Sequence, residues 1–92
     1  MTTRFQLPVE ISHSNVEAVL AEGIAVINTL QAENRLTVAC QALSIFDSSA
    51  LSVILSMRRH AQTKRVDIEL QSIPEKLASL AQVYGVADVV LV

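Results

Sequence analysis

The sequence IFDSSALSVIL, residues 45–55, marks a change from extended chain to helix, and this change decides the fold. Asp47, Ser48 and Ser49 favour a helix start, because short polar side chains accept hydrogen bonds from the unpaired amides of a first turn. Apolar residues then recur at helical spacing as far as Ala61. The pattern predicts a helix that follows a strand.

Three other stretches have the patterns of strands. Leu36–Cys40 is uncharged and mostly apolar, which is typical of a central strand buried on both faces, and the linker Ala42–Phe46 joins it to the helix. Phe5–Ile11 and Val66–Gln71 alternate apolar with polar residues, so each is predicted to be a strand with one face in water. Because Pro8 cannot donate to a ladder, we expect the first strand at a sheet edge.

Two further helices are predicted from their start signals. Ser14–Glu17 and Ser72–Glu75 both have the spacing of a capping box, in which a hydroxyl and a carboxylate satisfy the first amides of a helix. Apolar residues at helical spacing follow each box, as far as Leu30 in the first case and Tyr84 in the second. Gly85 is expected to stop the last helix.

Strands that alternate with helices predict an α/β fold, with right-handed crossovers that place the helices against the sheet. We expect a small, mostly parallel or mixed sheet of about four strands with three to four helices. The whole chain, residues 1–92, is predicted to form a single domain. The closing stretch Val86–Val92 is interpreted as either a short final strand or a packed tail.

The composition argues against several classes of function. A net charge of −2, two Phe, one Tyr and no Trp disfavour nucleic-acid binding. The single cysteine, Cys40, cannot form an internal disulfide, and His13 and His60 lie far apart, so no metal site is expected. No signal peptide, membrane span, Walker-type glycine loop or catalytic constellation is visible, so we expect a cytoplasmic protein without cofactor, metal or enzymatic activity.

The helix that begins near Ser48 has two different faces. At 100° per residue, its core face is predicted to contain Ala50, Ile54, Met57 and Ala61. The opposite column contains Ser48, Ser52, Leu55 and Arg59, with Leu51 beside it. Large aliphatic side chains on a water face, flanked by small hydroxyls, indicate a docking surface for a partner protein. In the alternative interpretation, a neighbouring loop covers the two leucines, or they are scattered surface residues.

Asp47 and Ser48 also have two interpretations. Either residue can be the N-cap that satisfies the orphan amides of the first turn. A hydroxyl at a helix N-terminus is also well placed for phosphorylation, because the amides and the helix dipole stabilise the added dianion. A catalytic nucleophile is not expected, since His60 lies about three turns away along the same helix.

The stretch Ile45–Leu55 resembles the Asp-Ser-Ser-Gly-Leu signature of STAS domains, the family of sulfate transporter and anti-sigma factor antagonist domains. Size and element order match that family over nearly the whole chain. The stretch Pro74–Asp88 is most similar to the MlaB-like branch, the cytosolic STAS subunits of bacterial phospholipid ABC transporters, which maintain outer-membrane lipid asymmetry.

The resemblance implies that Ser48 takes the position that is phosphorylated in anti-sigma factor antagonists, with Ser49 the less favoured site. It also implies that the helix face contacts a partner, either the transporter's ATPase subunit at the inner membrane or an anti-sigma factor kinase. The predicted partner-binding residues are Asp47, Ser48, Leu51, Ser52, Leu55 and Arg59. Ala39, Cys40 and Ala50 replace an acidic residue and a glycine common in the family, which favours the constitutive transporter subunit over the phosphorylation switch.

Overall fold

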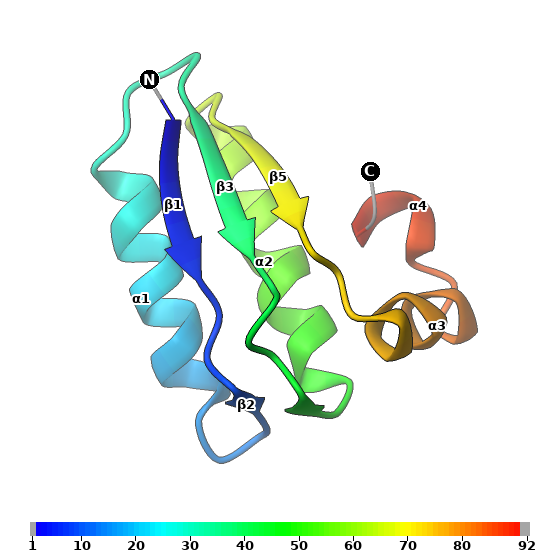
Figure 1. The fold of residues 1–92 in the computed structure, drawn as a ribbon. Coiled ribbons are helices and arrows are strands. Elements are labelled where there is room, and N and C mark those ends of the chain that lie inside the picture. The colour runs from blue at the N-terminus through cyan, green and yellow to red at the C-terminus, as the bar shows by residue number, and fades with distance from the viewer. Residues whose placement is uncertain (1, 91–92) are drawn as a thin grey trace.

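The computed structural model describes residues 2–90, and a parallel sheet with helices on one face forms its centre (Figure 1). A three-stranded sheet has the order β1-β3-β5 and a two-stranded sheet pairs β2 with β4, and every pairing within this described part is parallel. The elements are β1 (Thr2–Gln6), β2 (Glu10–Ile11), α1 (Val16–Asn28), β3 (Arg35–Ala39), β4 (Ile45–Phe46), α2 (Ser49–Thr63), β5 (Asp67–Gln71), α3 (Glu75–Val83) and α4 (Ala87–Val90).

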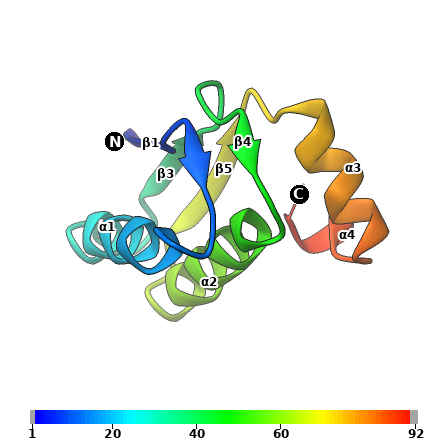
Figure 2. The same cartoon turned by 90° about the horizontal axis from the view of Figure 1, so that it is seen from below.

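The predicted α/β fold class is confirmed. The central strand is β3, whose residues Leu36–Ala39 are all buried, as the uncharged run predicted. β1 lies at a sheet edge, and β5 alternates exposed with half-buried residues, which also agrees with the sequence. Figure 2 shows α1 and α2 in one layer against the sheet, with α3 and α4 beyond β5. The sheet therefore has one polar face and one face that packs on helices.

The two long helices approach each other closely at Gly23. A Cβ atom built on Gly23 would lie 2.7 Å from Met57 Sδ and 2.8 Å from Met57 Cε. Met57 is buried in the hydrophobic core, so its tip has little room to move away. Glycine in the middle of α1 is therefore explained by helix packing rather than by helix propensity.

The predicted single strand Phe5–Ile11 is wrong, because the chain changes partners at Pro8. β1 pairs with β3, whereas β2 pairs with β4, which lies inside the stretch predicted to be a linker. Val9 was expected on the buried face but is 55% exposed. Its carbonyl oxygen accepts hydrogen bonds from the amides of Ser44 and Ile45, so a distant segment determines the conformation here.

Both predicted capping boxes are wrong. α1 begins after Asn15, and the hydroxyl of Ser14 lies 2.7 Å from the hydroxyl of Ser12 instead of capping the helix. α3 begins after Pro74 without a side-chain capping bond, and Ser72 has φ of +59°, outside helical geometry. In both places the short polar side chain belongs to a turn that precedes the helix.

Of the two interpretations of the C-terminal stretch, the strand is wrong and the packed tail agrees with the structure, which makes part of it helical. Gly85 ends the preceding helical segment with φ of +71°, as expected for a left-handed C-terminal glycine. The chain then forms the short helix α4, whose last residue Val90 is fully buried in the core. Tyr84 was expected in the apolar stripe of the last helix, but it lies just beyond that helix and is 58% exposed. The last two residues of the stretch lie outside the described part of the chain.

Candidate functional site

The start of α2 is organised by Asp47. Its Oδ1 atom accepts a hydrogen bond from the amide of Ser49 at 2.8 Å, so the capping bond comes from Asp47. Ser48 occupies the N-cap position but makes no side-chain capping bond. Hydrogen bonds from Ser49, first from its side chain and then from its backbone amide, lower the pKa of the Asp47 carboxyl. Ser48 is exposed and Ser49 is half-buried, so the Ser48 hydroxyl is the more accessible of the two.

The predicted core face of α2 is confirmed, since all four of its residues are buried: Ala50, Ile54, Met57 and Ala61. On the opposite column Ser48, Ser52 and Arg59 are exposed, and Leu55 is half-buried. The expectation that Leu51 faces water is wrong, because this side chain is only 3% exposed. α2 packs against α4 as well as against α1 and β5, so its buried arc is wider than a two-layer arrangement requires.

Part of the column lines a hollow between α2 and the start of α4. This hollow, here called the α2–α4 hollow, has a volume of about 250 Å³ and is lined by Ser48, Leu51, Ser52, Leu55, Tyr84 and Val86. Leucine, tyrosine and valine side chains supply its apolar wall, and the two serine hydroxyls supply its polar part. Four of the predicted partner-binding residues therefore meet in one place. Asp47 and Arg59 do not line this hollow.

Tyr84 and Val86 were missed as site residues by the sequence analysis. They lie more than thirty residues from Ser48 and enter the site from the α3–α4 corner, which periodicity within α2 cannot indicate. One feature of the sequence could have indicated Tyr84 as a site residue. It directly precedes Gly85, the glycine expected to end the helix, and such positions lie at a turn of the chain.

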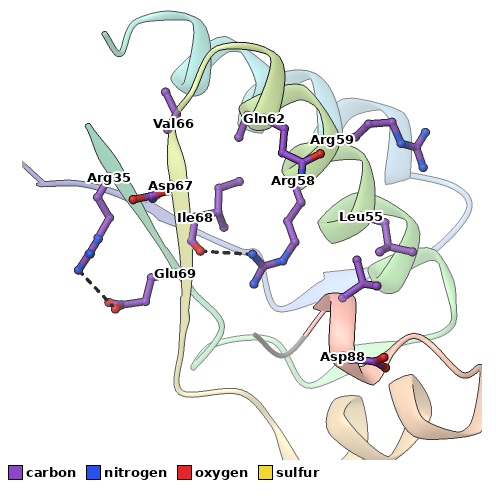
Figure 3. A pocket seen from close by; sticks show the side chains of 12 residues that line it. Arg35, Leu55, Arg58, Arg59, Gln62, Val66, Asp67, Ile68, Glu69 and Asp88 are labelled. Carbon is purple, nitrogen blue, oxygen red and sulfur yellow. Dashed lines mark hydrogen bonds and ion pairs between the residues drawn. The ribbon is translucent and has the colours of Figure 1, made fainter. Parts of the chain in front are cut away.

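Arg59 lies at a second, larger groove that shares Leu55 with the first (Figure 3). This groove has a volume of about 690 Å³ and runs between α2, β5 and α4. The Arg58 side chain reaches across it, donating to the carbonyl oxygen of Ile68 at 3.3 Å and to that of Val90 at 3.0 Å. Burial lowers the pKa of Arg58. In Figure 3 Arg59 turns away from β5, so the two arginines have different surroundings.

Other reactive groups lie outside the α2–α4 hollow. His60 Nε2 is 2.7 Å from Asn28 Oδ1, which joins the far end of α2 to α1. Cys40, the residue directly after β3, is buried, and this burial raises the pKa of its thiol to about 11. Among residues 2–90, no three potential ligands gather as a metal site would require, and no helix is long and apolar enough to cross a membrane.

Comparison with known proteins agrees with this architecture. The family described as "Mlab, STAS domain" matches residues 2–92. No curated protein matches the chain. A similar solved structure is that of the anti-sigma factor antagonist SpoIIAA in its unphosphorylated form, with a TM-score of 0.74 and 20% sequence identity. The match covers 95% of this chain and 75% of SpoIIAA, and it shows a common fold. The chain therefore belongs to the MlaB-type STAS domain family, as its resemblance predicted.

Proposed function

We propose that the chain is a non-enzymatic accessory subunit, which binds the ATPase of an Mla-type phospholipid ABC transporter on the cytoplasmic side of the inner membrane. Binding would stabilise or activate that ATPase and so maintain outer-membrane lipid asymmetry. Membership of the MlaB-type family supports this proposal. The observation that carries it is the α2–α4 hollow, where the exposed Ser48 and Ser52 adjoin the apolar Leu55, Tyr84 and Val86.

The chemistry of the hollow fits a protein partner. Its size suits one apolar side chain of the partner, and burial of that side chain against Leu55 and Tyr84 would supply most of the binding energy, as anchors in small pockets do. The hydroxyls of Ser48 and Ser52 are short enough to let a backbone approach closely. Arg59 at the neighbouring groove offers a positive charge to an acidic residue of the partner.

Co-expression with the ATPase subunit of an Mla-type phospholipid transporter tests the proposal. We expect Ser52→Asp and Leu55→Asp to abolish co-purification, because each leaves an unpaired carboxylate in the desolvated contact. Ser52 is exposed in the free chain, so its variant should fold even if the Leu55 variant does not. Ala25→Asp is the matched control, since it adds the same charge at an exposed position of α1. Undiminished association of both α2 variants would contradict the proposal.

A second candidate function is that of an anti-sigma factor antagonist switched by phosphorylation of Ser48. The fold shared with SpoIIAA and the exposure of Ser48 favour it. A phosphate would add about −1.5 to −2 charges at the edge of the hollow and repel the partner. Incubation with a cognate serine kinase, followed by intact-mass measurement, should show one added phosphate that Ser48→Ala removes and Ser49→Ala does not. An unchanged mass of the wild-type chain would exclude this function.

A further inference from the structure

The outer edge of β1 is open in the part of the chain that the structure describes. β1 pairs there with β3 alone, and the amide of Leu7, just after the strand, donates to the carbonyl oxygen of Ala39 at 2.9 Å. In an extended strand the N–H and C=O groups of one residue point to the same side, and successive residues alternate. Phe5 and Leu7 therefore direct these groups toward β3. The N–H and C=O groups of Arg4 and Gln6 point away from the sheet.

The opposite edge of the sheet, along β5, is bound by a side chain at one position. The same alternation directs the carbonyl of Ile68 outward from β5, and the Arg58 guanidinium binds it (Figure 3). Arg58 also binds the carbonyl of Val90 and so holds α4 beside that edge. Among the described residues nothing comparable covers β1. An unpaired strand edge can form backbone hydrogen bonds with another strand. The outward N–H and C=O groups of Arg4 and Gln6 can therefore pair with an extended polypeptide.

The side chains of β1 specify the chemistry of that polypeptide. Arg4 and Gln6 are exposed on the polar face of the sheet, whereas Phe5 is half-buried toward the helices. A strand added here would place one side chain beside Arg4 and the next beside Phe5. Arg4 donates across β3 to the amide oxygen of Gln71 on β5 at 2.6 Å, so a carboxylate on an added strand has to compete with this bond. A carboxylate can do so because it is a stronger, charge-assisted acceptor than an amide oxygen. An acidic residue alternating with an aliphatic one fits both positions.

The position of α1 favours a lone strand over a second copy of this chain. Figure 1 and Figure 2 both show α1 under β1 and beyond it, on the side away from β3. A second copy paired edge to edge through its own β1 would bring its own α1 into this layer and its own Arg4 toward the first. An added strand that has no covering helix and no arginine at this position avoids both the steric conflict with α1 and the repulsion from Arg4.

We propose that the open edge of β1 is a strand-addition site for an extended segment of a partner protein, with an acidic residue beside Arg4 and an aliphatic residue beside Phe5. The site does not depend on the proposed function. Figure 2 shows β1 and the α3–α4 corner at opposite ends of the sheet, so both surfaces can be occupied at once.

A blocked synthetic peptide of alternating Glu and Val tests the site on the full-length, isotope-labelled chain. At millimolar peptide we expect amide exchange of Arg4 and Gln6 to slow, while exchange of Val86 in the α2–α4 hollow stays unchanged. A matched peptide with Lys in place of Glu should bind about fivefold more weakly, as expected for the loss of a favourable cross-strand pair. The variant Arg4→Glu should reverse this preference.

Two proline variants separate binding from folding. Gln6→Pro removes an amide that points outward, so it should abolish peptide binding and retain the fold, whereas Phe5→Pro removes a ladder bond to β3 and should destabilise it. If Gln6→Pro does not fold, the peptide preference of Arg4→Glu still tests whether the peptide binds beside β1. Unchanged exchange of Arg4 and Gln6, or equal binding of the Glu and Lys peptides, would overturn the proposal. Dimerisation of the free chain that protects the same amides would overturn it as well.

Discussion

Gly23 of α1 faces the side chain of Met57 of α2 so closely that a β-carbon on Gly23 would lie 2.7 Å from Met57 Sδ. This contact sets how near the two helices come at Gly23, so a side chain added there has to displace Met57. The relationship joins residues from the two helices that cover the sheet, and one of these helices also carries the candidate site.

We predict that Gly23→Val lowers the free energy of unfolding by about 2 kcal/mol, because overpacking outweighs the gain in helix propensity. Urea denaturation measures this loss. Ala21→Val is the control, since Ala21 is exposed on the same helix and its change should stay within about 0.5 kcal/mol. Adding Met57→Ala to Gly23→Val should relieve part of the clash. Strictly additive effects of the two substitutions would contradict a direct contact.

Arg58 is expected to stabilise the C-terminal part of the fold through its bonds to Ile68 and Val90. Arg58→Ala should cost about 2 kcal/mol, because it removes charge-assisted bonds to two carbonyl groups together with the packed aliphatic stem. Arg59→Ala, on an exposed neighbour, should change stability by less than about 0.5 kcal/mol. Equal effects of the two variants in urea denaturation would show that the Arg58 bonds contribute nothing.

Cys40 predicts a loss of stability in alkaline solution. Its pKa in the folded chain is about 11, above the ordinary value of 9.0, because burial disfavours the thiolate. The unfolded chain therefore releases its proton first, so stability is fully present below pH 9.0 and falls as the pH approaches 11. Relative to Cys40→Ala, the wild-type chain should lose up to about 1.4 kcal/mol per pH unit in this window. Parallel pH profiles of the two proteins would refute this expectation.

Asp47 predicts the opposite dependence in acid. Hydrogen bonds from Ser49 lower its pKa from the ordinary value of 3.8, so its contribution is present above that pH and is lost as the carboxyl becomes protonated. Asp47→Ala should therefore lower the urea midpoint at neutral pH but have less effect near pH 3. Asp67→Ala is the control, because Asp67 is an exposed carboxylate on β5. A deficit of the Asp47 variant that is the same at both pH values would argue against the capping bond.

Much of the fold could be predicted because local pattern and tertiary environment agree. β3 was visible as an uncharged run, and the core face of α2 followed from helical spacing alone. The break between β1 and β2 could not be predicted, because Val9 fits the alternating pattern of one strand. In the structure its carbonyl oxygen instead accepts hydrogen bonds from Ser44 and Ile45, which lie far away in the sequence. The predicted capping boxes were wrong because both serines belong to turns before the helices. The Ser14 hydroxyl bonds to that of Ser12, and Ser72 has a positive φ angle.

The candidate site was predicted only as far as one helix extends. Ser48, Ser52 and Leu55 share a face of α2, and the structure brings them to one hollow. The other wall, Tyr84 and Val86, comes from a corner whose position depends on how α4 packs. Leu51 is buried and lines the same hollow as these two residues, so its environment could not be predicted from the spacing of residues within α2.

The exclusively parallel pairing of the strands has a consequence for how the chain acquires its structure. Among residues 2–90 no two hydrogen-bonded strands are joined by a tight hairpin, so each pairing there has to close a long loop before its hydrogen bonds form. α1 and α2 can form early because their hydrogen bonds are local, whereas the sheet forms only when segments far apart in the sequence come together. Folding of this chain should therefore be slower than that of a helical bundle of the same length, with association of β1, β3 and β5 as the slow step.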